Sequence, residues 1–224
     1  MDRPFTLSEG VDSWNTIIFL YRSALKEVST KVEILNDEFQ QVHQYNPIEY
    51  IKSRIKSPES IVKKLKRYGY ESSIDNMVDY INDIAGIRIV CSFTSDIYKL
   101  AEMIGKQNDL TVVSVKDYIK HPKENGYRSL HLIVAVPIFL QNEKREMKVE
   151  VQLRTIAMDF WASLEHKIRY KKNIPEDKAL YLQNEMLECA EISADLDRRM
   201  QNVRDVISEN TTPDERPLLL KELS

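Results

Sequence analysis

Two neighbouring segments alternate polar and apolar residues, and no other feature of the sequence constrains the fold as strongly. Polar side chains occupy every second position of both segments: Tyr127, Ser129 and His131 in YRSLH, and Glu150, Gln152 and Arg154 in VEVQLR. Side chains at this spacing share one face of a β-strand, and the polar turn QNEKRE between them favours an antiparallel hairpin. If the numbers of two directly paired residues, one from each strand, sum to an odd value, the polar side chains of both strands lie on the same face of the sheet. An ordinary solvent-facing sheet is the alternative.

A basic segment precedes this region. Residues 52–67 carry seven cationic side chains and a single acid. Ser57 and Pro58 are typical of a helix start, and Gly69 is typical of a helix end. Three residues recur on one face of this helix: Ser60, Lys64 and Arg67. Because a helix N-terminus also favours phosphate, the segment predicts a polyphosphate site, with a solvated basic face as the alternative.

The stretch DIAGIRIV brings a carboxylate and a guanidinium to a strand of aliphatic residues. Asp83 lies between a predicted helix and this strand, where a carboxylate could hold a magnesium ion on nucleotide phosphates, or simply end the helix. Arg88 lies inside the strand, and an unpaired buried guanidinium is costly, so we expect a partner or a ligand for it. Asp83 and Glu150 together could bind one metal ion, as in phosphoryl-transfer enzymes.

Long amphipathic segments flank this central region. Apolar residues recur at intervals of three and four from Trp14 to Val42 and from Leu182 to Ile207, which is typical of helices with one apolar face. Between them, helices are predicted near 57–69, 73–81, 96–107 and 155–170, and strands near 86–93, 110–118, 127–136 and 147–154. This order predicts an α+β fold with a mixed sheet of four or five strands surrounded by helices.

We expect one domain, because single domains commonly contain about 100–200 residues. It is predicted at 14–208, with flanking helices at 14–45 and 176–208, an N-terminal tail at 1–13 and a C-terminal tail at 209–224. The two helical seams carry more apolar surface than one core needs.

Composition limits the possible classes of protein. The 224 residues are 42% hydrophobic and 30% charged, with a formal net charge of −3, so nucleic-acid binding would depend on a local patch. The two cysteines lack CxxC spacing, which favours a reducing cytoplasm. No window approaches the roughly 18 apolar residues of a spanning helix, so we expect no membrane insertion. Neither a P-loop nor a GxGxxG motif is present.

Several motifs, in order, resemble those of the RelA/SpoT-type alarmone synthetases: SRIKSPESIVKKLKR, INDIAGIRIVCSF, VKDYIKHPKENGYRSLHLIV and VEVQLRTIAMDFWASLEHKIRYK. The resemblance spans roughly residues 14–208 and is strongest to stand-alone small alarmone synthetases of the RelP type. It implies a nucleotidyltransferase-like sheet, Mg²⁺ as cofactor, and a homotetramer built through the terminal helices. The implied reaction transfers the β,γ-pyrophosphate of ATP to the 3′-hydroxyl of GDP or GTP, giving ppGpp or pppGpp.

The resemblance also implies roles for individual residues. For ATP, it implies adenine contacts by Arg54 and Arg88, and phosphate contacts by Lys56, Ser60, Lys64 and Arg67. For catalysis, it implies Mg²⁺ binding by Asp83 and Glu150, with Glu150 also orienting or deprotonating the 3′-hydroxyl. For GDP or GTP, it implies guanine stacking on Tyr127, phosphate contact by Lys123, and supporting contacts by Ser129, His131, Gln152 and Arg154.

The long members of this family also carry a hydrolase domain with an adjacent His-Asp pair. This chain contains no such dipeptide, so we expect synthesis without hydrolysis. The alternatives are another nucleotidyltransferase, or a nucleotide sensor or RNA-binding module that uses the basic segment without chemistry. We do not expect nucleic acid to be required.

Overall fold

The computed structural model of the chain describes residues 14–169 and 176–210. The predicted N-terminal tail and nearly all of the predicted C-terminal tail lie outside these residues. The described elements follow in the order α1 (Trp14–His43), β1 (Ile48–Ile55), α2 (Pro58–Arg67), α3 (Ile74–Tyr80), β2 (Ala85–Cys91), α4 (Thr94–Gly105), β3 (Thr111–Asp117), β4 (Leu130–Phe139), β5 (Lys144–Thr155), α5 (Ile156–Arg169) and α6 (Glu176–Asn210).

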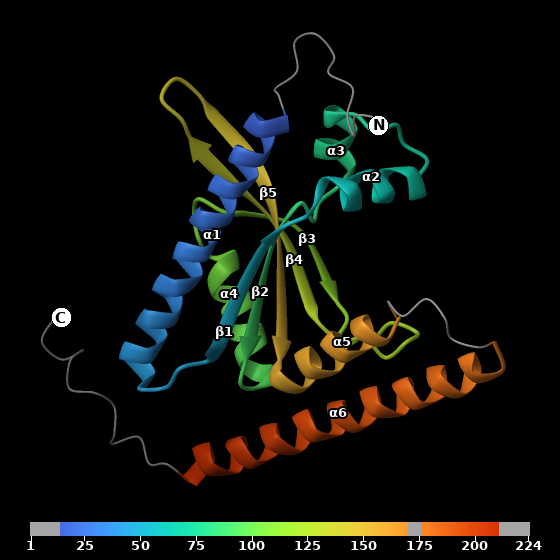
Figure 1. Cartoon of the computed structure of the whole chain (residues 1–224). Helices are drawn as coiled ribbons and strands as arrows, with labels where there is room; N and C mark the ends of the chain where they lie inside the picture. Colours follow the sequence, from blue (N-terminus) through green and yellow to red (C-terminus); the bar gives the residue numbers. More distant parts are fainter. Residues whose placement is uncertain (1–13, 170–175, 211–224) are drawn as a thin grey trace, which may run out of the picture.

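The strands form one mixed five-stranded sheet in the order β1-β2-β5-β4-β3. β2 and β5 run parallel, and the other neighbouring pairs are antiparallel. Helices α1 and α4 lie on one side of the sheet, and α5 and α6 lie at one end (Figure 1). The predicted α+β class with a mixed sheet is therefore confirmed.

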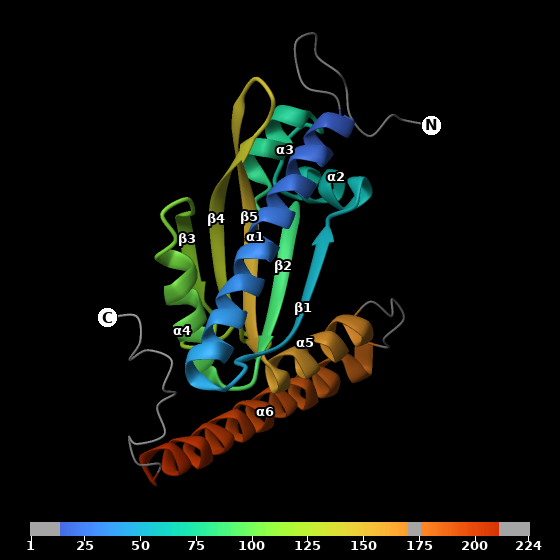
Figure 2. The same cartoon turned by 90° about the vertical axis from the view of Figure 1, so that its left-hand side faces the viewer.

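One face of the sheet packs in the hydrophobic core. Inward-facing residues such as Ile87, Val151 and Leu132 are at most 3% exposed. Helix α1 crosses this face, and α4 lies beside it (Figure 2). The apolar stripe of α1, which includes Tyr21 and Val28, is buried there. The opposite face of the sheet is left for polar side chains.

The register of the β4–β5 hairpin decides which side chains share that polar face. His131 opposes Gln152, and Ile133 opposes Glu150, so opposed residue numbers sum to an odd value. This confirms the condition under which the polar faces of the two strands coincide. Strand β4 begins at Leu130 rather than at Tyr127, so Tyr127 reaches the polar face from the preceding loop.

Local sequence explains the entry to α2 and its exit. The Ser57 side chain accepts a hydrogen bond from the Ser60 backbone N–H, and Pro58 occupies the first turn. Gly69 follows the helix with a φ of 81°, a conformation that glycine adopts at little cost. The predicted start and end of this helix are confirmed.

Two expectations need correction. Strand β1 was not predicted, although its eight residues after Pro47 are rich in isoleucine. The apolar seam of α1 was expected to be partly exposed, but the sheet buries it because α1 packs across the core face. Only the seam of α6 stays open, with Leu196, Met200 and Val203 about half exposed. Within the described residues, no helix has the length and apolar character needed to cross a membrane.

Candidate active site

The polar face of the sheet gathers side chains from four strands. Register places them side by side across β1, β2, β5 and β4: Tyr50, Lys52 and Arg54, then Gly86 and Arg88, then Glu150, Gln152 and Arg154, then His131. Because alternate residues of each strand share a face, this surface follows directly from the register. It lies opposite the face that α1 covers.

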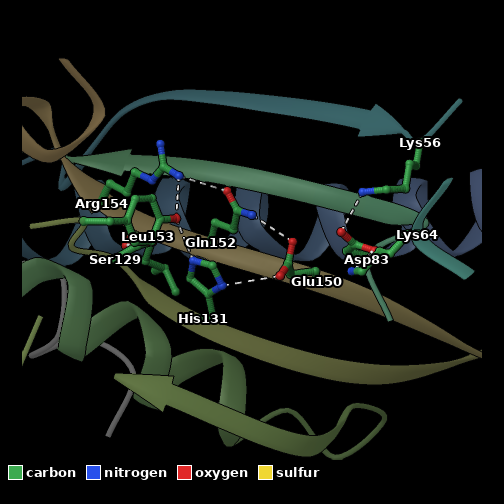
Figure 3. Close-up of polar contacts among 10 residues, drawn as sticks. Lys56, Lys64, Asp83, Ser129, His131, Glu150, Gln152, Leu153 and Arg154 are labelled. Atoms are coloured by element: carbon green, nitrogen blue, oxygen red, sulfur yellow. Dashed lines mark hydrogen bonds and ion pairs between the residues drawn. The ribbon is translucent and has the colours of Figure 1, made fainter. Parts of the chain in front are cut away.

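Five polar side chains form a closed ring of hydrogen bonds. Four of them belong to this sheet face, and the fifth is Tyr127 in the loop before β4. His131 Nδ1 lies 3.3 Å from Glu150 Oε1, and His131 Nε2 lies 2.9 Å from the Tyr127 hydroxyl. Arg154 Nη2 donates to the Tyr127 hydroxyl at 2.6 Å and to Gln152 Oε1 at 3.4 Å. Gln152 Nε2 donates to Glu150 Oε2 at 2.8 Å (Figure 3). The two oxygens of Glu150 are thus held by different partners, which fixes the direction of the carboxylate.

The ring also defines where its protons lie. Arg154 can only donate, so the Tyr127 oxygen accepts from it and the Tyr127 O–H is directed to His131 Nε2. In the neutral imidazole the remaining proton is then on Nδ1, facing Glu150. We assign this tautomer from the hydrogen-bond pattern.

Glu150 is ionised in this arrangement. Burial alone would raise the pKa of Glu150, but the hydrogen bonds from His131 and Gln152 outweigh burial and hold it below its usual value. The negative charge of Asp83 raises the pKa of Glu150, which shows that the two carboxylates act on each other across the site.

Asp83 lies between α3 and β2 and is held by two lysines. Lys56 Nζ donates to Asp83 Oδ2 at 2.7 Å, and Lys64 Nζ donates to Asp83 Oδ1 at 2.8 Å. Burial raises the pKa of Asp83, but these two hydrogen bonds and charges lower it further than burial raises it. Lys56 comes from the end of β1 and Lys64 from α2, so the carboxylate joins both segments.

The donor set suits a hard divalent cation. Asp83 and Glu150 supply carboxylate oxygens, the ligands that Mg²⁺ prefers, and Mg²⁺ commonly uses only one or two carboxylates together with substrate phosphates and water. No group of three or more potential metal-ligating side chains gathers within residues 14–169 and 176–210. The residues present therefore fit a metal ion that is held jointly with a nucleotide, rather than a closed structural site.

A pocket of about 200 Å³ lies on this face, over β1, β2 and β5. Its lining includes Arg54, Gly86, Arg88 and Glu150. Gly86 opposes Arg54 on one side and Glu150 on the other, and its lack of a side chain keeps the space between them open. The two predicted adenine-contacting arginines, Arg54 and Arg88, are therefore brought to one pocket.

A buried carboxylate at the start of α5 organises the other end of the face. Asp159 is 3% exposed; its Oδ1 lies 2.9 Å from Arg154 Nη1 and 3.1 Å from Arg88 Nη1. The Tyr50 hydroxyl donates to Asp159 Oδ2 at 2.6 Å. Burial raises the pKa of Asp159, but the Tyr50 hydrogen bond and both arginine charges lower it below its usual value. The predicted partner of Arg88 is thus a carboxylate.

Aromatic and cationic groups surround Tyr127. The Lys123 ammonium lies 4.8 Å from the centroid of the Tyr127 ring and 4.6 Å from that of Tyr118, and the Arg154 guanidinium carbon lies 5.0 Å from the Tyr127 centroid. Burial lowers the pKa of Lys123. The structure thus brings Lys123, Tyr127 and Arg154 together in one cluster.

Three predicted site residues are placed differently from this cluster. The Ser129 hydroxyl is fully buried and donates to the Leu153 carbonyl at 3.0 Å, so it supports the hairpin rather than facing the open surface. Ser60 and Arg67 are exposed on α2; Ser60 accepts from Ser57, and the Arg67 guanidinium lies over the ring of Tyr68.

Sequence reasoning did not assign site roles to Tyr50, Gly86 or Asp159. The signal for Tyr50 was the β-branched stretch IEYIKSRI after a proline, which is typical of a strand. Gly86 had a weaker signal, a glycine inside an aliphatic strand. Asp159 had none, because its contacts join residues far apart in the chain.

The chain is similar in sequence to known proteins. Residues 53–175 match the family described as "Region found in RelA / SpoT proteins". The chain is 49% identical over 198 residues to "GTP pyrophosphokinase YwaC" of Bacillus subtilis, covering 88% of this chain and 93% of that protein. It is 36% identical over 198 residues to "GTP pyrophosphokinase YjbM" of the same organism, covering 88% and 90%.

Solved structures give the same result. The small alarmone synthetase 2 from Bacillus subtilis matches with a TM-score of 0.76 and 46% identity, over 87% of this chain and 99% of that chain. The small alarmone synthetase 1 from Bacillus subtilis, bound to its product pppGpp, matches with a TM-score of 0.78 and 34% identity, over 87% and 97%.

Proposed function

Because this chain belongs to the RelA/SpoT protein family, we propose that it is a GTP pyrophosphokinase of the small alarmone synthetase type. The reaction transfers the β,γ-pyrophosphate of ATP to the 3′-hydroxyl of GDP or GTP, giving AMP and ppGpp or pppGpp. Similarity to proteins that bear this name supports the proposal, as does similarity to a small alarmone synthetase bound to pppGpp.

The donor nucleotide is proposed to occupy the pocket beside Gly86. Arg54 and Arg88 border this pocket, and planar guanidinium groups stack well on an adenine ring. Lys56 and Lys64 lie at its outer end on Asp83 and would hold the ATP phosphates, with Ser60 and Arg67 on the exposed face of α2.

Asp83 and Glu150 are proposed to hold Mg²⁺. When bound with nucleotide, this ion would neutralise phosphate charge and position the transferred group. Asp83 is at present neutralised by Lys56 and Lys64, so the same lysines can turn to the phosphates once a divalent cation takes their place.

The acceptor nucleotide is proposed to lie at the other end of the face. Guanine would stack on the aromatic ring of Tyr127, and the Lys123 ammonium would move from this ring to the phosphates of the acceptor. His131, Gln152 and Arg154 would keep their hydrogen bonds around the site. Ser129 supports this loop through the Leu153 carbonyl.

Glu150 lies between the two proposed nucleotide sites and is ionised, so it can accept a hydrogen bond from the 3′-hydroxyl. In the reaction, the O3′–Pβ bond forms, the bond between Pβ and the α–β bridging oxygen breaks, and AMP leaves with the electron pair. The hydroxyl proton passes to the Glu150 carboxylate. Cationic side chains supply electrostatic stabilisation of the transferred group.

One observation carries this proposal: the Glu150 carboxylate is held in a fixed direction near the lysine-bound Asp83 (Figure 3). A sensor or RNA-binding module has no need of two interacting carboxylates on its ligand face, whereas metal-assisted phosphoryl transfer does.

The direct test is incubation of the protein with Mg²⁺, ATP and GDP or GTP, followed by anion-exchange chromatography. We expect AMP and a more highly phosphorylated guanosine nucleotide in equal amounts. Folded protein that releases no AMP would contradict the proposal. Transfer of a nucleotidyl group with release of pyrophosphate would instead identify another nucleotidyltransferase. Incubation of the product with the protein should give no hydrolysis.

We further propose a homotetramer in the cytoplasm that needs no nucleic acid for activity. The exposed apolar seam of α6 supports self-association, and the two free cysteines, Cys91 and Cys189, suit a reducing compartment.

A further inference from the structure

Asp159 is the one carboxylate that contacts arginines on both sides of the proposed site, among the residues that the structure describes. Its Oδ1 is shared by Arg88 Nη1 at 3.1 Å and Arg154 Nη1 at 2.9 Å, and Tyr50 occupies Oδ2. With its side chain 4% exposed, the carboxylate is shielded from water, so these contacts are strong and leave no room for a substrate atom.

The two arginines serve different ends of the polar face. Arg88 lines the donor pocket with Arg54 and Gly86. Arg154 donates to the Tyr127 hydroxyl at 2.6 Å, which places it on the acceptor side. They lie on the parallel strands β2 and β5, where Arg88 pairs with Gln152 and Val90 pairs with Arg154. Asp159 therefore connects two guanidinium groups that are proposed to serve different nucleotides.

Without Asp159, this arrangement would be unstable. Burial disfavours the charged form of Arg88, and the positive charge of Arg154 acts in the same direction, whereas Asp159 opposes both effects. Two guanidinium groups that share a half-buried space repel each other unless a carboxylate neutralises them. The position of each arginine thus depends on Asp159 and, through it, on the other arginine.

Neither arginine has all of its donors paired. The Nε atoms of Arg88 and Arg154 are buried and have no hydrogen-bond partner among the described residues. Buried donors without partners are rare and need an explanation. Each guanidinium is anchored through Nη1 to Asp159 and keeps an unpaired Nε–H.

We propose that Asp159 is a positioning residue that couples the two nucleotide sites. A nucleotide in the donor pocket fixes the position of the Arg88 side chain. Through Asp159, this also fixes the positions of Arg154 and of Tyr127, which Arg154 contacts. The inference rests on the proposed function for the identity of the two ligands. Because linkage is reciprocal, acceptor binding must favour donor binding by the same factor.

The test measures this coupling by calorimetry in the wild-type protein and in Asp159→Asn. The probe is α,β-methylene-ATP, whose bridging carbon cannot be cleaved at the bond that the reaction breaks, titrated with Mg²⁺ in the absence and presence of saturating GDP. We expect GDP to tighten probe binding in the wild type by roughly 5- to 150-fold, the usual range for coupled sites. In Asp159→Asn we expect this factor to fall close to one.

Tyr50→Phe is the matched control, because it removes a hydrogen bond from the same carboxylate and keeps both arginine contacts. It should retain the wild-type coupling factor. A purely structural role for Asp159 would lower the thermal midpoint without changing the coupling, so the midpoint of each variant is measured in parallel. If Asp159→Asn does not fold, Asp159→Glu keeps the charge but moves the carboxylate by one methylene, and it should still reduce the coupling.

Wild-type turnover separates the two proposals. If the wild type makes no alarmone, the proposed function fails. If it does, and the coupling factor is absent in the wild type or unchanged in the folded Asp159 variant, the function stands and the inference is overturned.

Discussion

His131 and Glu150 face each other across the β4–β5 pair, with 3.3 Å between His131 Nδ1 and Glu150 Oε1. They are not directly opposed in register, because His131 pairs with Gln152 and Glu150 with Ile133. Their contact is therefore a diagonal one, which long side chains on one face of a sheet can make. It directs the carboxylate toward the space between the proposed donor and acceptor sites.

This relationship makes Glu150 the most informative position to change. Glu150→Gln keeps the size of the side chain and removes its charge, so we expect kcat to fall by about 10²- to 10⁴-fold, the usual contribution of a general base, while ATP binding is mostly kept. Steady-state AMP release and calorimetry with an ATP analogue measure the two quantities. Glu146→Gln, an exposed change on the same strand, should be silent. Full turnover by Glu150→Gln would show that Glu150 is not the general base.

Lys64 should matter far more than its neighbour Lys63. Lys64 lies 2.8 Å from Asp83, whereas Lys63 is exposed on α2. We expect Lys64→Gln to lower kcat/KM for ATP by about 10- to 100-fold, equivalent to about 1.4–2.7 kcal/mol of transition-state stabilisation, and Lys63→Gln to change it less than about twofold. Equal effects of both changes would favour a diffuse basic surface.

Gly86 offers a test of the donor pocket that does not alter a charge. A Cβ atom at this position meets its nearest neighbours at 3.9 Å, so Gly86→Ala should fold and keep much of its activity. Gly86→Val adds a Cβ and two methyl groups between Arg54 and Glu150 and suits a strand, so we expect a normal thermal midpoint but loss of ATP-analogue binding. Tight binding by folded Gly86→Val would show that adenine lies elsewhere.

Two carboxylates, the buried Asp159 and the half-buried Asp197, should respond to pH in opposite ways. The pKa of Asp159 is lowered by Tyr50 and the arginines despite burial, so its stabilising contribution is complete above the unfolded pKa of about 3.9 and is lost as the pH falls through the lower folded value. We therefore expect Asp159→Asn to cost about 3 kcal/mol at pH 7, and the difference from wild type to shrink below about pH 4. Denaturant unfolding at both pH values measures this.

For Asp197 the sign is reversed. Burial raises its pKa, which the hydrogen bond from Thr155 and the charge of Arg128 only partly offset. Its contribution is most favourable below the unfolded pKa and is lost as the pH rises through the folded one. Asp197→Asn keeps an acceptor for Thr155 and removes the buried charge, so it should raise the thermal midpoint at pH 7. A lower midpoint at pH 7 than wild type would contradict this assignment.

The apolar seam of α6 should carry self-association. Leu196 and Val203 are 53% and 54% exposed, so replacing both with glutamate should leave the monomer folded and lower the mass measured by light scattering. Phe139→Glu is a suitable control, because Phe139 is 76% exposed at the hairpin tip and should not affect the mass. An unchanged mass in the α6 variant would show that another surface mediates self-association.

Much of the fold was predictable because it depends on local pattern. The Ser57 cap and the Gly69 end of α2 were visible as residue types with strong local preferences. The coincidence of the polar faces of β4 and β5 was predictable only as a condition on register. Strand β1 was missed because its isoleucines, Ile48, Ile51 and Ile55, recur at intervals of three and four rather than two.

The sequence by itself determined the alternation that puts Glu150, Gln152 and Arg154 on one face, the basic helix, and, through its motifs, the family. The tertiary structure decided which partners these groups have. It turned Ser129 inward to the Leu153 carbonyl, buried the seam of α1, and placed Asp159 between Arg88 and Arg154. These outcomes depend on contacts between segments distant in the chain, where packing and charge pairing compete, and periodicity carries no information about which contact wins.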